Sequence, residues 1–121
     1  MQEVHGKNIA GKIIPLQGDV TKKSDVDKLV KEIESKHGYL DILVNDAGIA
    51  PGKTEPSGKN ATELKKNLYD DVTDEDWSAT YMTNVYGPYL MSVAFIPLLQ
   101  EATDRTKGYV ASTFVLARAS S

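Results

Sequence analysis

The chain has 121 residues, 40% of them hydrophobic and 26% charged, with a formal net charge of -3. This length allows one domain, and this composition is typical of a globular protein. No basic run stands out, which argues against nucleic acid or an anionic membrane as a partner. No apolar run approaches the roughly 20 residues of a membrane span, and no signal-peptide core is present. Without cysteine, and with only two isolated histidines, the sequence predicts no metal site and a cytoplasmic location.

The first half predicts a strand, a helix and a second strand. Residues 12–17 are predicted as a strand, which Pro15 confines to a sheet edge or an interrupted ladder. A helix is expected from Ser24 to the glycine at 38, because apolar residues recur there at helical spacing. Residues 40–44 then form a short apolar run typical of a buried parallel strand. Short joins between the three elements predict a right-handed βαβ unit.

The second half predicts a long loop, a long helix and a last strand. Residues 50–72 are rich in turn-forming residues, and a loop of this length is commonly functional or disordered. The longest helix is expected over 73–99, with a stripe of large apolar residues at every fourth position. Pro88 should kink this helix or lengthen one turn, because it lacks a backbone N–H donor. A β-branched and aromatic run at 109–117 predicts a strand.

Three short motifs follow the predicted strands or lie in the long helix. They are Asp19-Val20, the run Asn45-Asp46-Ala47-Gly48, and Asn84. Taken singly, the first is as readily a turn before a helix, the second a generic strand-to-helix turn, and the third a solvent-facing helix residue. Taken together and in this order, they resemble the central part of a short-chain dehydrogenase/reductase. The resemblance covers roughly residues 9–121, with Asp46 in place of the usual second Asn, and is nearest to the 3-oxoacyl-[acyl-carrier-protein] reductase type.

The resemblance implies a role for each matching residue. Asp19 would accept a hydrogen bond from the adenine amino group of the cofactor, and Val20 would contact the adenine ring. Asn45, Ala47 and Gly48 would line the cofactor trough and steady the central sheet. The remaining two roles are catalytic: Asn84 would hold a proton-relay water, and Ser121 would bond the substrate carbonyl unless it belongs to a frayed tail.

Two motifs of the family have no counterpart in the chain. None of the nine glycines forms the Gly-rich turn that holds the cofactor pyrophosphate. None of the six tyrosines has a lysine four residues later, although the family uses this pair to lower the tyrosine pKa for proton transfer. The resemblance therefore implies a partial NAD(P)-binding domain over residues 1–121 that lacks turnover by itself.

The expected fold is α/β, an incomplete Rossmann-like parallel sheet of three strands with flanking helices. Its first βαβ unit and its C-terminal strands are expected to be absent. The resemblance implies an oxidoreductase that interconverts a small-molecule carbonyl and a secondary alcohol with NAD or NADP, NADP being slightly favoured. Two alternatives stay open: a non-catalytic interaction module or homo-oligomer that uses the 73–99 helix, and a non-functional truncated remnant.

Overall fold

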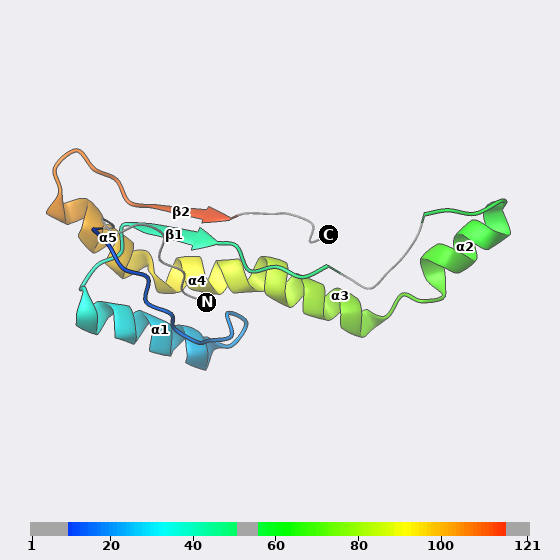
Figure 1. The fold of residues 1–121 in the computed structure, drawn as a ribbon, viewed down its shortest axis with the longest axis horizontal. Coiled ribbons are helices and arrows are strands. Elements are labelled where there is room, and N and C mark those ends of the chain that lie inside the picture. The colour runs from blue at the N-terminus through cyan, green and yellow to red at the C-terminus, as the bar shows by residue number, and fades with distance from the viewer. Residues whose placement is uncertain (1–9, 51–55, 116–121) are drawn as a thin grey trace.

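The computed structural model describes residues 10–50 and 56–115. A run of consecutive helices forms the long axis of the molecule (Figure 1), with the sheet and α1 beside one end and α2 beyond the other. None of the helices in these two ranges is long and apolar enough to cross a membrane. In chain order the elements are α1 (Lys23–Lys36), β1 (Ile42–Asn45), α2 (Ala61–Tyr69), α3 (Asp74–Tyr81), the π-helix η1 (Met82–Tyr86), α4 (Gly87–Ala94), α5 (Ile96–Arg105) and β2 (Ser112–Val115).

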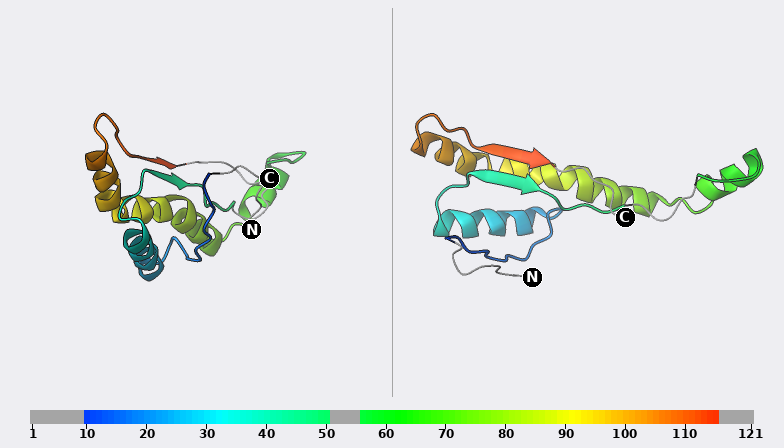
Figure 2. Two further views of the ribbon diagram at one scale, coloured as in Figure 1. Left: turned by 60° about the vertical axis from the view of Figure 1, so that its left-hand side comes forward. Right: turned by 45° about the horizontal axis from the view of Figure 1, so that its top comes forward.

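The sheet of the described chain has two parallel strands, β1 and β2, with Ile42 opposite Ser112 and Asn45 opposite Val115. Helices α1 and α4 pack against each other on one side of this sheet (Figure 2). Alternate residues of β1 are buried and exposed because helices cover one face of the strand, so the strand predicted as buried is covered on one face only. The core is centred on Leu43, Phe95 and Leu98. This arrangement confirms the α/β class and the parallel, incomplete Rossmann-like sheet.

The prediction of a strand over residues 12–17 is wrong. Residues 12–17 have no strand pairing and are exposed, although they run as extended chain. Residues 12–17 would be the third strand of a doubly wound sheet with the strand order 3-2-1-4-5-6. In that order the third strand pairs with the second and lies well away from the fourth. No segment of the described residues supplies the first or second strand, so this segment has no neighbour to which it could hydrogen-bond. Its apolar side chains therefore stay exposed, as Ile13 does at 59%.

The predicted 73–99 helix is divided into α3, η1, α4 and the start of α5. The π-helix η1 ends at Tyr86, two residues before Pro88, and the Gly87 N–H that follows it donates to the Met82 carbonyl five residues earlier. Proline has no N–H donor and its ring collides with the preceding turn of an α-helix. The wider turn of a π-helix accommodates both the missing donor and the ring. The lengthened turn expected at Pro88 is thus confirmed. A second break lies at Phe95, which separates α4 from α5 ahead of Pro97.

The predicted loop over 50–72 contains a helix, α2, which the sequence reading missed. Asn60 caps it, because its Oδ1 accepts from the Glu63 N–H at 2.9 Å while Glu63 accepts from the Lys59 N–H at 3.0 Å. The bond to Asn60 satisfies one N-terminal donor of the helix, and the bond from Lys59 ties the Glu63 side chain to the residue before the cap, in a variant of the capping box. At the other end of the helical run, α5 continues to Arg105, six residues beyond the predicted end of the long helix at 99.

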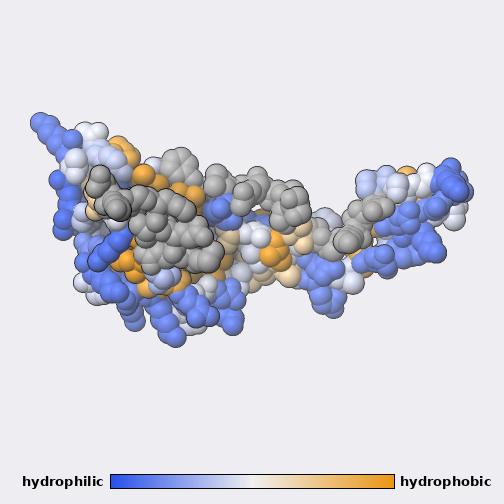
Figure 3. Space-filling model, viewed as in Figure 1, coloured by the Kyte–Doolittle hydropathy of each residue, from blue (hydrophilic) through white to orange (hydrophobic). Residues whose placement is uncertain are grey.

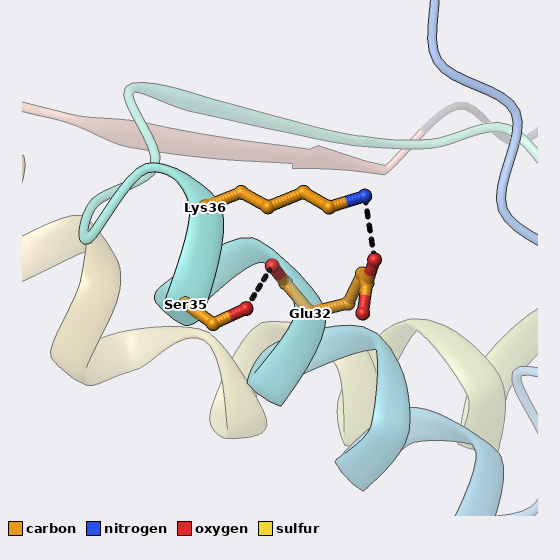
Figure 4. A network of polar contacts seen from close by, with 3 residues as sticks. All are labelled: Glu32, Ser35 and Lys36. Carbon is orange, nitrogen blue, oxygen red and sulfur yellow. Dashed lines mark hydrogen bonds and ion pairs between the residues drawn. The ribbon is translucent and has the colours of Figure 1, made fainter.

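Helix α1 confirms the predicted helix, with its first residue at Lys23. Its exposed side carries local contacts around Glu32 (Figure 4). The Lys36 Nζ lies 2.6 Å from the Glu32 carboxylate, and the Ser35 hydroxyl donates to the Glu32 carbonyl at 3.0 Å. Both side chains of the ion pair are about half exposed, so it adds only a few tenths of a kcal/mol. Burial of its apolar face, with Val26 at 2% exposure, holds α1 in place.

Candidate functional site

The carboxyl end of β1 is where the predicted site residues meet. Parallel α/β sheets bind ligands at this edge, because loops and helix starts leave a crevice there. A small hollow of about 80 Å³ lies at this end of the strand. Its lining comes from three segments: Val20 before α1, residues 44–47 at the end of β1, and Pro88 and Met91 in α4. Three predicted cofactor residues, Val20, Asn45 and Ala47, thus line one hollow together with Asp46.

Asn84 ties the segment after β1 to η1. Its side-chain Oδ1 accepts from the Ile49 N–H at 2.8 Å, and its Nδ2 donates to the Ile49 carbonyl at 2.7 Å. One amide side chain thus satisfies both backbone polar groups of a residue 35 positions earlier. A Cβ on Gly48 would lie 3.3 Å from the Asn84 Oδ1, a close approach that a glycine suits. The clamp therefore fixes the backbone that leaves β1.

A second contact holds the 19–20 turn against the long helical run. A Cβ on Gly87 would lie only 2.8 Å from Val20 Cγ2, so the absence of a side chain at Gly87 lets the turn approach the helix. Gly87 and Pro88 are both buried. The sequence reading missed Gly87, although a glycine next to a proline at the centre of an apolar helix was a visible signal.

Asp19 shapes the turn that presents Val20. Its Oδ1 accepts from the Thr21 hydroxyl at 2.6 Å and from the Thr21 N–H at 2.9 Å, and these bonds hold the pKa of Asp19 below its usual value. The Asp19 N–H in turn donates to the Asp25 carboxylate at 2.9 Å. An ionised, exposed carboxylate therefore stands next to the hollow that Val20 lines, although Asp19 does not itself line it.

Asn45 is the buried polar residue of β1, at 8% exposure. Its Nδ2 lies 3.4 Å from the Ser92 hydroxyl of α4, so it joins the strand to the helix beneath. Ser92 was not among the predicted residues, yet it follows Asn84 by two helical turns and so shares its side of the run. Ser121 lies outside the described residues. No group of three potential metal ligands gathers in the part of the chain that the structure describes.

A larger hollow of about 480 Å³ lies at the opposite end of β1. It is enclosed by residues 12–16, the last turns of α1 and the approach to the strand. Leu40 and Asp41, which line it, precede β1, so this hollow borders the amino end of the strand. Ligands of parallel sheets bind at the other edge. The smaller hollow is therefore the better candidate for a cofactor site.

Comparison with known proteins identifies the family. The pattern of the short chain dehydrogenase family matches residues 1–117, nearly the whole sequence. The chain belongs to this family. It is 37% identical over 98 residues to the short-chain dehydrogenase/reductase PhomF′ of Diaporthe leptostromiformis, covering 78% of this chain and 33% of that protein. The chain thus spans about a third of the length of this relative.

Solved structures of family members have the same arrangement. A 3-ketoacyl-(acyl-carrier-protein) reductase from Brucella melitensis, complexed with NADH, superimposes with a TM-score of 0.59 at 32% identity, covering 79% of this chain and 34% of that one. An NADPH-bound carbonyl reductase from chicken fatty liver gives a TM-score of 0.57 at 27% identity, covering 73% and 30%. The matched proteins thus include short-chain dehydrogenases of different types.

The clamp predicts that Asn84→Ala will release the segment after β1. The Ile49 amide loses its acceptor, so we expect its hydrogen exchange to accelerate by about tenfold or more. Hydrogen exchange followed by NMR measures this directly. Asn67→Ala is the matched control, because the Asn67 amide donates to the Ser57 carbonyl in the α2 region instead. Unchanged exchange at Ile49 in Asn84→Ala would contradict the clamp.

Proposed function

We propose that this chain forms part of the NAD(P) site of an oxidoreductase that interconverts a carbonyl and a secondary alcohol. The observation that carries the proposal is the meeting of Val20, Asn45 and Ala47 around one hollow at the carboxyl end of β1. Membership of the short-chain dehydrogenase family supports the reaction class. When bound, the nicotinamide cofactor would supply or accept the hydride.

The residues present fit the adenine end of such a cofactor. The hollow of about 80 Å³ is smaller than the roughly 300 Å³ or more of a complete ligand pocket, so it suits one part of a dinucleotide. Val20 offers an apolar contact for the adenine ring, and the ionised Asp19 offers an acceptor for its amino group. Gly48 keeps the neighbouring backbone free of side-chain atoms, which lets a ligand approach closely. A pyrophosphate-binding glycine turn is not in the sequence.

We propose two roles for Asn84. It positions the backbone after β1, and it holds a water. Its two bonds to Ile49 set the path of the backbone along the proposed cofactor trough. Beyond these bonds, an amide oxygen can accept once more and an amide nitrogen can donate once more, which is what a relay water needs. Ser121 remains the proposed substrate-carbonyl contact by resemblance.

The finer points of the function remain predictions. The 3-oxoacyl-carrier-protein reductase type is one of several types among the matched structures, so we propose a small-molecule carbonyl or alcohol without naming it. The matched structures hold NADH in one case and NADPH in another, and the preference for NADP remains a prediction. Because the sequence lacks the Tyr-x-x-x-Lys pair, we expect this chain to reduce no ketone by itself.

Titration of the chain with AMP, followed by NMR, tests the cofactor proposal. We expect shifts at the amides of Val20 and of residues 45–48, and none around the larger hollow. Asp19→Asn keeps an acceptor for Thr21 but replaces the other carboxylate oxygen with a donor, so AMP affinity should fall by about fivefold. Asp27→Asn, on the exposed side of α1, is the matched control. Shifts confined to residues 12–16 and 36–41, or equal affinities for both variants, would contradict the proposal.

A second candidate function is self-association through the long helical run. Five large apolar residues lie at every fourth position along α3, η1 and α4, and each is at least 46% exposed. We call them the apolar stripe: Trp77, Tyr81, Val85, Tyr89 and Val93. On the face drawn in Figure 3, hydrophobic side chains are visible along this run, between the main body and the mostly hydrophilic α2. Exposed apolar patches of this kind are typical of protein interfaces.

The π-helix keeps the apolar stripe on one side. In an uninterrupted α-helix of 3.6 residues per turn, each four-residue step rotates the side chain by roughly 40° beyond a full turn. Over the whole stripe this would add up to roughly 160° and spread it around the helix. A π-helix has more residues per turn, so the side chains within η1 rotate in the opposite sense. This reverses part of the drift in the middle of the stripe, near Val85. The stripe can therefore serve as one contact surface.

We propose that two copies pair their stripes in antiparallel fashion about a two-fold axis at Val85. This register places Trp77 of one copy against Val93 of the other, and Tyr81 against Tyr89, so large residues meet small ones or another ring. Val85→Glu should therefore give a monomer in sedimentation velocity, because two charges would be buried at the axis. Val110→Glu, a change at a residue 75% exposed and outside the stripe, is the control. A monomeric parent chain, or an unchanged dimer in Val85→Glu, would contradict this pairing.

A further inference from the structure

The small hollow at the carboxyl end of β1 has one charged side chain in its wall. Asp46 follows the last residue of β1 directly, is exposed, and lines the hollow. The other described residues that line it carry no charge: they are Val20, Val44, Asn45, Ala47, Pro88 and Met91. A ligand that enters the hollow therefore meets a carboxylate and, in the described part of the wall, no cation.

The turn beside the hollow does not cancel this charge. Hydrogen bonds from Thr21 and, to a smaller extent, the charge of Lys22 hold the pKa of Asp19 below its usual value. Lys22 thus offsets part of the charge of Asp19, and neither of these two residues lines the hollow. Among the described residues, Asp46 therefore supplies the charge of the hollow itself.

Asp46 is also the point at which the chain departs from the motif of its family. The run Asn45-Asp46-Ala47-Gly48 has an aspartate where the motif usually has a second asparagine. The two side chains have nearly the same shape, but a carboxylate only accepts hydrogen bonds, whereas an amide also donates them. The chain thus carries a negative charge where a neutral group is usual, with little change in the space available to a ligand.

We infer that Asp46 is a specificity-determining residue that makes the hollow select an uncharged adenine nucleoside over an adenine nucleotide. This inference rests on the proposed adenine site. A phosphate monoester carries a charge of about −1.5 to −2 at pH 7, and like charges repel each other. With its base in the hollow, AMP is short enough to keep its phosphate within about 10 Å of the wall, which is the Debye length at 0.1 M salt. Adenosine carries no such charge.

The same charge orients a dinucleotide. Repulsion by Asp46 disfavours entry of the pyrophosphate, so the base is the part of the cofactor that enters the hollow. Because Asp46 is exposed, water and salt screen this repulsion, and we expect it to change affinities by a few fold without abolishing binding.

Asp46→Asn on the full chain tests the inference, because it removes the charge and keeps the shape of the side chain. The affinities of adenosine and AMP are measured by NMR titration, followed at the Val20 amide. At 0.1 M salt, the ratio of adenosine affinity to AMP affinity should be about threefold lower in the variant than in the parent chain. At 1 M salt, where the Debye length is about 3 Å, the two chains should have the same ratio. A purely structural effect of the substitution would not depend on salt in this way.

Asp41→Asn is the matched control. Asp41 is also exposed, but it precedes β1 and lines the larger hollow at the opposite end of the strand. Removal of its charge should leave the ratio unchanged at 0.1 M salt, because the length of β1 separates it from the small hollow by more than a Debye length.

Two sets of results distinguish this inference from the proposed function. An unchanged ratio in Asp46→Asn, a change that persists at 1 M salt, or an equal change in Asp41→Asn would overturn the role of Asp46. The adenine site would still stand in these cases, because both ligands would still shift the Val20 amide. A parent chain in which neither ligand shifts Val20 or residues 45–48 would overturn both.

Discussion

The amide of Asn84 joins two parts of the chain on which the candidate site depends. It satisfies both the N–H and the carbonyl of Ile49, so the backbone that leaves β1 is held against η1. The hollow beside Asn45 and Ala47 exists because this backbone and the helical run are held in fixed relation.

Pro88 and Gly87 explain why the helical run can provide this clamp. A proline within the run disfavours the regular bonding pattern, and the π turn before it provides a wider spacing. Asn84 lies within that turn. π turns of this kind occur frequently at functional sites. The same turn lets Val20 approach Gly87 and keeps the apolar stripe in register, so one backbone irregularity serves both the proposed cofactor site and the proposed interface.

Sequence patterns predicted a helix or strand correctly where the folded chain also provides a neighbour for that element to pack against or pair with. The helix after the 19–20 turn carries an apolar spacing that matches its burial. The strand that ends at Asn45 was predicted from its apolar run, although Ile42 and Val44 in that run are exposed. The segment 12–17 carries a strand pattern as well, but strand formation needs a partner, and the pattern contains no information on whether one is present. Helix α2 was missed because its apolar residues are few, although Asn60 followed by Glu63 is a capping-box signal.

The candidate site was predictable in its residues and not in its contacts. Val20, Asn45 and Ala47 were named from a family resemblance, and the fold brings them to one hollow. Ile49 could not be found from the sequence, because its contribution is made entirely by backbone atoms. Gly87 could not be interpreted either, since a glycine in a helix indicates a close approach without indicating what approaches.

A nuclear Overhauser spectrum of the full chain tests the central claim most directly. We expect cross-peaks from the Asn84 side-chain amide protons to Ile49, and from the Val20 methyl groups to the Gly87 α-protons. Together these contacts would place the 19–20 turn, the end of β1 and the π-helix at one edge of the sheet. A spectrum in which the Asn84 amide protons show only neighbours within its own helix would contradict the account.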